Sequence, residues 1–284
     1  MRIEILGSGG AIPTPRPGCT CRVCVEAREK GVPYRRTGPS LFLHGPDILF
    51  DTPEESKEQL NRAKIGHVAA CFYSHWHPDH VAGLRVWEAL NQDFRRWPPQ
   101  NRATTIYLPQ QVARDFRHWM GYFECLTFFE KQGLVWVVEL SDGDTVHVDG
   151  VRISPFRLAE DYVYAFLVEA HGTRALLAPD ELLDWDPPAT LQNLDLAVLP
   201  MGVVEFDPFT GERRIPAAHP ILNSEATYRQ TLDMAAKLRP KRVVLTHIEE
   251  PDGLSLDDLR LLEARQSIGG MQITFAYDTM VLDV

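Results

Sequence analysis

The stretch Ser74-His75-Trp76-His77-Pro78-Asp79-His80 decides how this sequence is interpreted. It follows the apolar run Ala69–Tyr73, which predicts a buried strand, and it precedes apolar residues spaced as in a helix. The motif is therefore expected on a strand-to-helix loop. Its three histidines and one aspartate are the imidazole and carboxylate donors that Zn²⁺, Mn²⁺ and Fe²⁺ bind in proteins.

The spacing within the motif suits two neighbouring metal ions better than one. In an extended chain alternate side chains share a face, so His75 and His77 point the same way. The turn at Pro78 then lets Asp79 and His80 face a second point a few ångströms away.

Composition limits the class of protein. The chain has 284 residues, of which 44% are apolar and 10% aromatic, enough to bury a core and to exclude disorder. Apolar runs are too short to cross a bilayer, and the N-terminal Met1–Leu6 predicts a strand and not a signal peptide. The net charge of −10 argues against non-specific nucleic-acid binding. We expect one domain over residues 1–284 in a cytoplasmic protein without a membrane partner.

Short runs rich in Val, Ile, Leu and aromatic residues, bounded by Gly, Pro or Asp, predict many short strands. The expected strands are Arg2–Leu6, Ser40–Leu43, Asp47–Phe50, Ala69–Tyr73, Thr105–Leu108, Leu134–Glu139, Arg152–Phe156, Val163–Glu169, Arg174–Leu177, Leu194–Leu199, Arg242–Leu245, Met271–Phe275 and Met280–Leu282. Helices are expected after His80 and over Pro109–Phe123, Glu225–Leu238 and Ser255–Arg265, where Ser255 and Asp258 form a capping box. This order favours two sheets with helices outside over a doubly wound sheet.

The cysteines predict a second metal site. The chain has five, an odd number, and Cys19, Cys21 and Cys24 stand close together. A disulfide framework would be even-numbered and spread out, so this spacing indicates a structural zinc knuckle at about 19–24. Its alternative is a loop of three reduced, oxidation-prone thiols. Cys71 and Cys125 lie in apolar surroundings and are expected to be ordinary buried thiols.

The pattern His75-x-His77-x-Asp79-His80 resembles the signature of the metallo-β-lactamase superfamily. That resemblance implies an α/β fold, a four-layer αβ/βα sandwich with metals at one sheet edge. It also implies roles for three residues that follow predicted strands: Asp51 supports the metal loop, Asp180 bridges two metals, and His247 is a late ligand.

Within the superfamily, the start Leu6-Gly7-Ser8-Gly9-Gly10 and the cysteine knuckle followed by Arg35-Arg36 resemble the cyclic phosphodiesterases of the bacterial phosphonate-degradation (carbon–phosphorus lyase) pathway. The resemblance implies a small-molecule phosphodiester substrate, cyclic ones included, and a homodimer. It further implies that His219, followed by Asn223, is a catalytic residue on the leaving-group side.

The sequence departs from that family in two places. No histidine lies between Arg152–Phe156 and Val163–Glu169, so Glu160 or Asp161 is expected to replace the third imidazole beside His75 and His77. The alternative is that both acids are solvated turn residues. In that case only the metal position formed by Asp79, His80, Asp180 and His247 is occupied, and the active site holds one Zn²⁺ or Mn²⁺ ion instead of two.

The second departure concerns the knuckle. Where the family has the last ligand of its structural zinc, this chain has Glu250. Three thiolates and one carboxylate form an unusual but feasible tetrahedral set, which would attach the N-terminal loop to the segment after His247.

These residues predict a metal-dependent phosphodiesterase in which a metal-bound hydroxide attacks phosphorus. Asp79 would orient the nucleophile while ligating, and His219 would protonate the leaving group. Trp76, Tyr162 and Tyr164 adjoin the motif segments and could line a pocket, although such rings more often belong to a core. The alternatives are another hydrolase of this fold (a lactonase or nuclease), a pyrroloquinoline-quinone-biosynthesis type of protein, and a non-catalytic metal-binding module.

Overall fold

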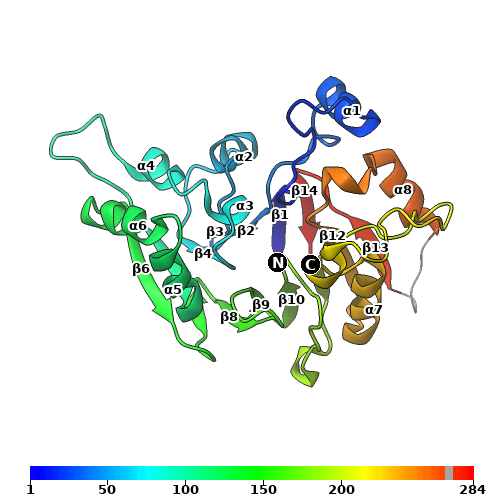
Figure 1. Cartoon of the computed structure of the whole chain (residues 1–284). Coiled ribbons are helices and arrows are strands. Elements are labelled where there is room, and N and C mark those ends of the chain that lie inside the picture. Colours follow the sequence, from blue (N-terminus) through cyan, green and yellow to red (C-terminus); the bar gives the residue numbers. More distant parts are fainter. Residues whose placement is uncertain (266–270) are drawn as a thin grey trace.

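The computed structural model describes residues 1–265 and 271–284. Two seven-stranded mixed sheets pack face to face, and helices cover both outer faces (Figure 1). The layers run helix, sheet, sheet, helix. This arrangement confirms the predicted αβ/βα sandwich.

The first sheet has the order β14-β1-β2-β3-β4-β5-β6. Its strands are β1 (Arg2–Gly7), β2 (Ser40–His44), β3 (Ile48–Phe50), β4 (Ala70–Phe72), β5 (Thr104–Pro109), β6 (Val135–Leu140) and β14 (Met280–Asp283). The second sheet has the order β13-β12-β11-β10-β9-β8-β7. Its strands are β7 (Val146–Val148), β8 (Val151–Arg157), β9 (Tyr164–Ala170), β10 (Thr173–Leu177), β11 (Leu196–Pro200), β12 (Arg242–Thr246) and β13 (Gln272–Phe275).

The inner faces of the two sheets share one apolar core. Phe50 and Phe72 from the first sheet meet Phe166 from the second, with ring centres 5.2 and 5.7 Å from the Phe166 ring. Full burial of such side chains contributes roughly 1.5–3 kcal/mol each, so this layer fixes how the sheets face one another.

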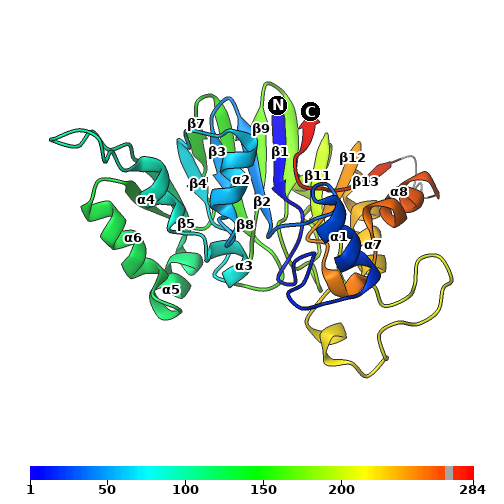
Figure 2. The ribbon, with the colours of Figure 1, turned by 90° about the horizontal axis from the view of Figure 1, so that it is seen from above.

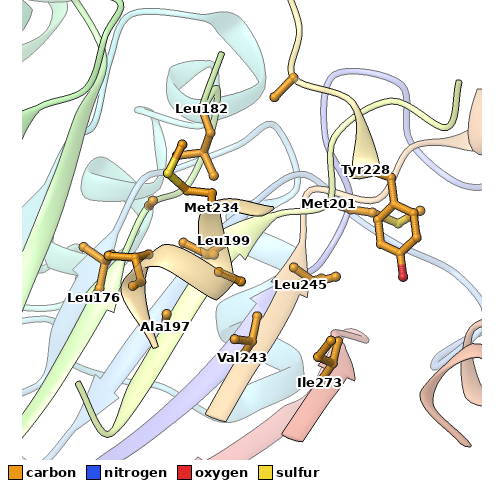
Figure 3. Packing of buried hydrophobic residues seen from close by; sticks show 14 of the residues in the cluster. Leu176, Leu182, Ala197, Leu199, Met201, Tyr228, Met234, Val243, Leu245 and Ile273 are labelled. Carbon is orange, nitrogen blue, oxygen red and sulfur yellow. The ribbon is translucent and has the colours of Figure 1, made fainter. Parts of the chain in front are cut away.

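Each outer face has its own helices. The first sheet is covered by α2 (Ser56–Ala63), α3 (Pro78–Val81), α4 (Val86–Asn91), α5 (Gln110–His118) and α6 (Tyr122–Lys131). The second is covered by α7 (Tyr228–Leu238) and α8 (Leu256–Arg265), and α1 (Arg22–Lys30) lies beside them (Figure 2). Figure 3 shows Met234 of α7 beside Leu182 and Leu199 in this outer core. Three short 3-10 turns complete the description: η1 (Ala189–Leu191), η2 (Pro220–Asn223) and η3 (Glu250–Asp252).

The predicted helix Pro109–Phe123 is wrong as a single element. The structure has two helices there, α5 and α6, because Met120 and Gly121 between them have φ angles of 58° and 68°. Such left-handed residues cannot continue a helix. The capping box before α8 is confirmed, with Ser255 N donating to Asp258 (2.9 Å) and Asp258 N to Ser255 Oγ (3.3 Å).

Strand direction decides which loops meet. β3, β4 and β5 are parallel, and so are β10, β11 and β12, so the loops after β3, β4, β10 and β12 gather at one edge of the sandwich. The two termini lie together at the opposite edge (Figure 2), where Met1 N donates to the Val284 carbonyl at 2.7 Å. Among the described residues, no helix has the length and apolar content needed to cross a membrane.

Candidate metal centre

Asp51 organises the loop that carries the histidine motif. It follows β3 with a left-handed φ of 59° and is fully buried. Its carboxylate accepts hydrogen bonds from Ser74 N (2.8 Å), Ser74 Oγ (2.7 Å) and His80 Nδ1 (2.8 Å). The last bond fixes the tautomer of His80 and turns its Nε2 toward the site.

Two groups of donor atoms form at this edge. The first donor group contains His75, His77 and Asp180, and the second donor group contains Asp79, His80 and His247. Asp180 follows β10 and His247 follows β12, so residues from both sheets converge as the resemblance implied. The donor atoms within each group lie within 4.8 Å of one another.

Distances across the groups match those expected around metal ions. Asp180 Oδ2 lies 3.2 Å from His75 Nε2 and 3.6 Å from His80 Nε2, and Asp180 Oδ1 lies 3.5 Å from His247 Nε2. Two donors on one tetrahedral ion with bonds of about 2.1 Å would be about 3.4 Å apart. The Asp180 carboxylate therefore lies between the two groups and could bridge two ions.

Three buried nitrogen atoms in the site have no hydrogen-bond partner. They are Nε2 of His75, of His80 and of His247. Buried polar atoms are rarely left unpaired, because an unmade hydrogen bond costs about 1–3 kcal/mol. Nitrogen and carboxylate oxygen atoms facing one another in this way fit divalent metal ions.

The charges of the site divide its histidines into two kinds. Burial and the neighbouring His75 lower the pKa of His77 to about 4, and burial with His80 lowers that of His75. Burial alone would also lower the pKa of His247, but Asp180 and Asp79 raise it to about 10. His80 behaves likewise, since the carboxylates of Asp79 and Asp51 raise its pKa against the effect of burial.

The carboxylates respond in the opposite direction. Burial would raise the pKa of Asp79, but His80 and His247 hold it well below its usual range. His247 and His75 likewise depress the pKa of Asp180 against its burial. Both acids are therefore ionised at neutral pH, as metal ligands must be.

A glycine lets the segment after β1 approach the segment after β12 beside the donor groups. Gly10 lies against the His247 ring, and a Cβ there would be 2.4 Å from His247 Cε1 and 2.7 Å from Glu249 Oε1. His247 itself has a left-handed φ of 54°. The glycine-rich start of the chain thus accommodates a metal-site histidine.

The prediction that Glu160 or Asp161 replaces the third imidazole is not supported: neither belongs to a donor group among the described residues. Asp161 is exposed, and the Glu160 carbonyl accepts Val163 N in a tight turn. The same turn brings Tyr162 to the site instead. Its ring centre lies 5.5 Å from that of His77 and 6.2 Å from that of His75.

Glu250 lies among the three cysteines of the predicted knuckle. Its Oε1 lies 3.2 Å from Cys19 Sγ, 3.0 Å from Cys21 Sγ and 3.6 Å from Cys24 Sγ. All four donor atoms lie within 4.8 Å of one another. Burial raises the pKa of Cys24 to about 12, which a bound cation would reverse.

A cavity of about 270 Å³ opens beside the donor groups. It is lined by His77, Asp79, Asp180 and His247 together with four further acids, Glu181, Glu225, Glu249 and Asp252. The sequence analysis did not identify these four. Glu181 and Glu249 stand one and two residues after predicted ligands, which was the available signal, whereas nothing marked Glu225 before the fold was known.

His219 lies on the rim of the site. It is exposed, its Nδ1 accepts a hydrogen bond from Ile221 N at 3.2 Å, and Ile221 is the nearby residue that lines the cavity. Its catalytic role stays a prediction.

Comparison with known proteins gives the following relationships. Residues 45–248 match the family model of the Beta-lactamase superfamily domain. An octanoyltransferase from Porphyromonas gingivalis is 29% identical over 161 residues, 56% of this chain and 30% of that protein. A ribonuclease Z from Methanosarcina mazei is 29% identical over 184 residues, 62% of this chain and 47% of that protein. The matched segments thus span less than half of either relative.

Solved structures share the fold along the whole chain. A diphosphatase from the PhnP family has a TM-score of 0.72 at 23% identity, covering 100% of this chain and 97% of that one. The Zn²⁺-bound PqqB from Methylobacterium extorquens has a TM-score of 0.72 at 17% identity, covering 100% of both chains.

Proposed function

The chain belongs to the Beta-lactamase superfamily, and we propose that it is a metal-dependent hydrolase, a phosphodiesterase that acts on a small phosphodiester, cyclic ones included. The active site would hold one or two Zn²⁺ or Mn²⁺ ions in the two donor groups, and a structural Zn²⁺ would occupy the knuckle.

One observation carries this proposal. Three buried histidine nitrogens without hydrogen-bond partners face the carboxylates of Asp79 and Asp180 at 3.2–3.6 Å. A site built for structure alone would pair such atoms. This one keeps them free at the mouth of a cavity, which suits cations that react with a substrate.

The chemistry follows from the residues in place. Bound ions supply Lewis acidity, which activates water near neutral pH and stabilises charge on phosphoryl oxygens. Asp180 would hold both ions through its two oxygens, and Asp79 would orient the attacking water while ligating. Asp51 keeps His80 in the ligating tautomer. His219 would have to approach the leaving group to protonate it, because it lies outside the cavity lining.

The preference for a small diester rests on the size of the cavity and on relatives. About 270 Å³ is enough for a compact ester. Among structures of the same fold is a diphosphatase of the PhnP family.

The experiment is hydrolysis of bis(p-nitrophenyl) phosphate and of a cyclic nucleotide diester by protein loaded with Zn²⁺ or Mn²⁺. His80→Ala and Asp180→Ala are expected to abolish turnover while circular dichroism stays unchanged. The exposed His67→Ala serves as the matched histidine control. Full activity in either site variant, or none in the wild type with either metal, would refute the assignment.

A nuclease is the second candidate, because ribonuclease Z is a relative over 62% of this chain. The net charge of −10 favours the small diester over a polyanion. An RNA hairpin with a 3′ extension, assayed beside the small diesters under the same conditions, separates the two candidates.

A further inference from the structure

The two donor groups are not equally complete. The group of Asp79, His80 and His247 gains a fourth donor from Asp180 Oδ1, 3.5 Å from His247 Nε2. The group of His75, His77 and Asp180 has three donors from the described His, Cys, Asp and Glu side chains. A catalytic Zn²⁺ ion keeps a position for water beside its protein ligands. The group of His75, His77 and Asp180 therefore has one protein donor fewer than the other group.

Backbone hydrogen bonds position Tyr162 beside the group of His75, His77 and Asp180. The turn between β8 and β9 is closed by Val163 N donating to the Glu160 carbonyl at 3.2 Å. It is joined to the histidine loop by Tyr164 N, which donates to the Ser74 carbonyl at 3.1 Å. These bonds hold the Tyr162 ring beside His75 and His77, and its centre lies 6.5 Å from that of the Trp76 ring.

The ring separations agree with three side chains around one ion. With metal–ligand bonds of about 2 Å, a histidine ring centre lies roughly 3 Å from the ion and a tyrosine ring centre roughly 4–5 Å. At a tetrahedral angle the two ring centres are then about 6 Å apart. The observed separations are 5.5 Å from His77 and 6.2 Å from His75.

We propose that Tyr162 completes the first donor group as an oxygen ligand, in the position for which the sequence offers no histidine. The inference rests on the proposed function, since it requires that the two groups bind metal ions. On binding, a metal–oxygen bond replaces the phenol O–H bond, and the proton passes to buffer without any oxidation or reduction.

The test compares wild type with Tyr162→Phe, which keeps the ring and removes the oxygen. Zn²⁺ per chain is counted by elemental analysis after equilibration with excess zinc and gel filtration. Near-ultraviolet difference spectra on adding Zn²⁺ to metal-free protein report ionisation of a tyrosine. The control is Tyr164→Phe, whose hydroxyl donates to Asp142 at 3.0 Å, outside both donor groups.

We expect about three zinc ions in wild type and in the control, and about two in Tyr162→Phe. The tyrosinate signal should appear in wild type and the control and be lost in Tyr162→Phe. An unchanged zinc count with no tyrosinate signal in wild type would overturn the inference, whether or not the diesters are hydrolysed. Turnover of the diesters by wild type tests the proposed function separately, so a failure of either can be told from a failure of the other.

Discussion

At the scale of single residues, Asp51 determines whether the histidine loop can bind metal. It accepts three hydrogen bonds and supplies no donor atom to either group. In Asp51→Asn an amide N–H would face Ser74 or His80, and the bond that orients His80 would be lost. We expect zinc affinity at the active site to fall about 10–100-fold.

Competition with a chromophoric chelator measures this loss. Asp47→Asn is the matched control, because Asp47 precedes the same strand and also has a left-handed φ, of 54°. Equal zinc affinities in the two variants would contradict the role of Asp51.

The histidine charges predict different pH dependence for the two donor groups. At pH 7 and without metal, the raised pKa values keep His80 and His247 protonated, while His75 and His77, with lowered pKa values, are neutral. A cation entering the second group must displace about two protons, so its affinity rises with pH, about 100-fold per unit, until the pKa of His247 near 10 is passed. The first group releases no histidine proton, and its one proton comes from the Tyr162 phenol that we propose as a ligand.

Calorimetry in buffers of different ionisation enthalpy counts these protons. His75→Ala isolates the second group and His80→Ala the first. The same proton release in both variants would contradict the division into protonated and neutral histidines.

The active-site ligands that sequence analysis identified lie on segments that follow strands. His75 to His80 come after β4, Asp180 after β10 and His247 after β12, and parallel strands bring such positions together. Glu160 belongs to neither donor group of the described residues: it lies in a turn, where the direction of a side chain depends on backbone angles that composition does not reveal. The same turn directs Tyr162 inward.

At the scale of elements, the close approach of the segments after β1 and β12 depends on Gly10. A methyl group there would overlap the His247 ring and the Glu249 carboxylate. Gly10→Ala is expected to displace His247, removing one zinc per chain and most hydrolytic activity. Gly66→Ala, where the added Cβ meets nothing within 4 Å, is the control. Normal metal content in Gly10→Ala would contradict this view of the packing.

The apolar strands were predictable because their burial follows from their own composition. β7, α1 and α2 were not: β7 has three residues, and the N-cap of α1 is Cys21, whose thiol accepts a hydrogen bond from Cys24 N at 3.5 Å. A thiol cap is absent from the usual helix-start signals, and the apolar face of α1 is narrow. Its position depends on the knuckle.

At the scale of the whole molecule, the knuckle joins residues about 230 positions apart through Glu250 and three thiols. Glu250→Ala is expected to release the zinc and free residues 15–30. Tryptic cleavage at Arg22 or Arg28 should then accelerate at least about tenfold, since cleavage follows the population of the open segment. The control is Glu58→Ala, which removes an exposed ion pair with Arg35. Unchanged cleavage would mean that the loop is held without metal.

The charge of the molecule also bears on substrate choice. Beyond the donor groups the cavity is lined by Glu181, Glu225, Glu249 and Asp252, and no Lys or Arg of the described chain lines it. Burial raises the pKa of Glu225 to about 9 and that of Asp252 to about 7, so this wall gains negative charge as the pH rises. Once it is charged, a diester whose alcohol part carries a carboxylate or second phosphate would meet like charges, and one carrying an ammonium group would meet opposite charges. At distances of 6–8 Å and an effective dielectric of about 20, each such pair is worth roughly 2 kcal/mol before screening.

We therefore expect kcat/KM for a choline-substituted phosphodiester to exceed that for a carboxylate-substituted analogue by at least about tenfold at low salt and at a pH above about 9, and by less at neutral pH, where Glu225 is uncharged. At the higher pH the ratio should shrink in Glu225→Gln, which then removes one charge without touching the donor groups, and also as ionic strength rises. Glu212→Gln, an exposed acid outside the cavity lining, should leave it unchanged. A preference for the carboxylate analogue would instead mean that the bound metal ions dominate the field throughout the cavity and that the acidic wall does not select the substrate.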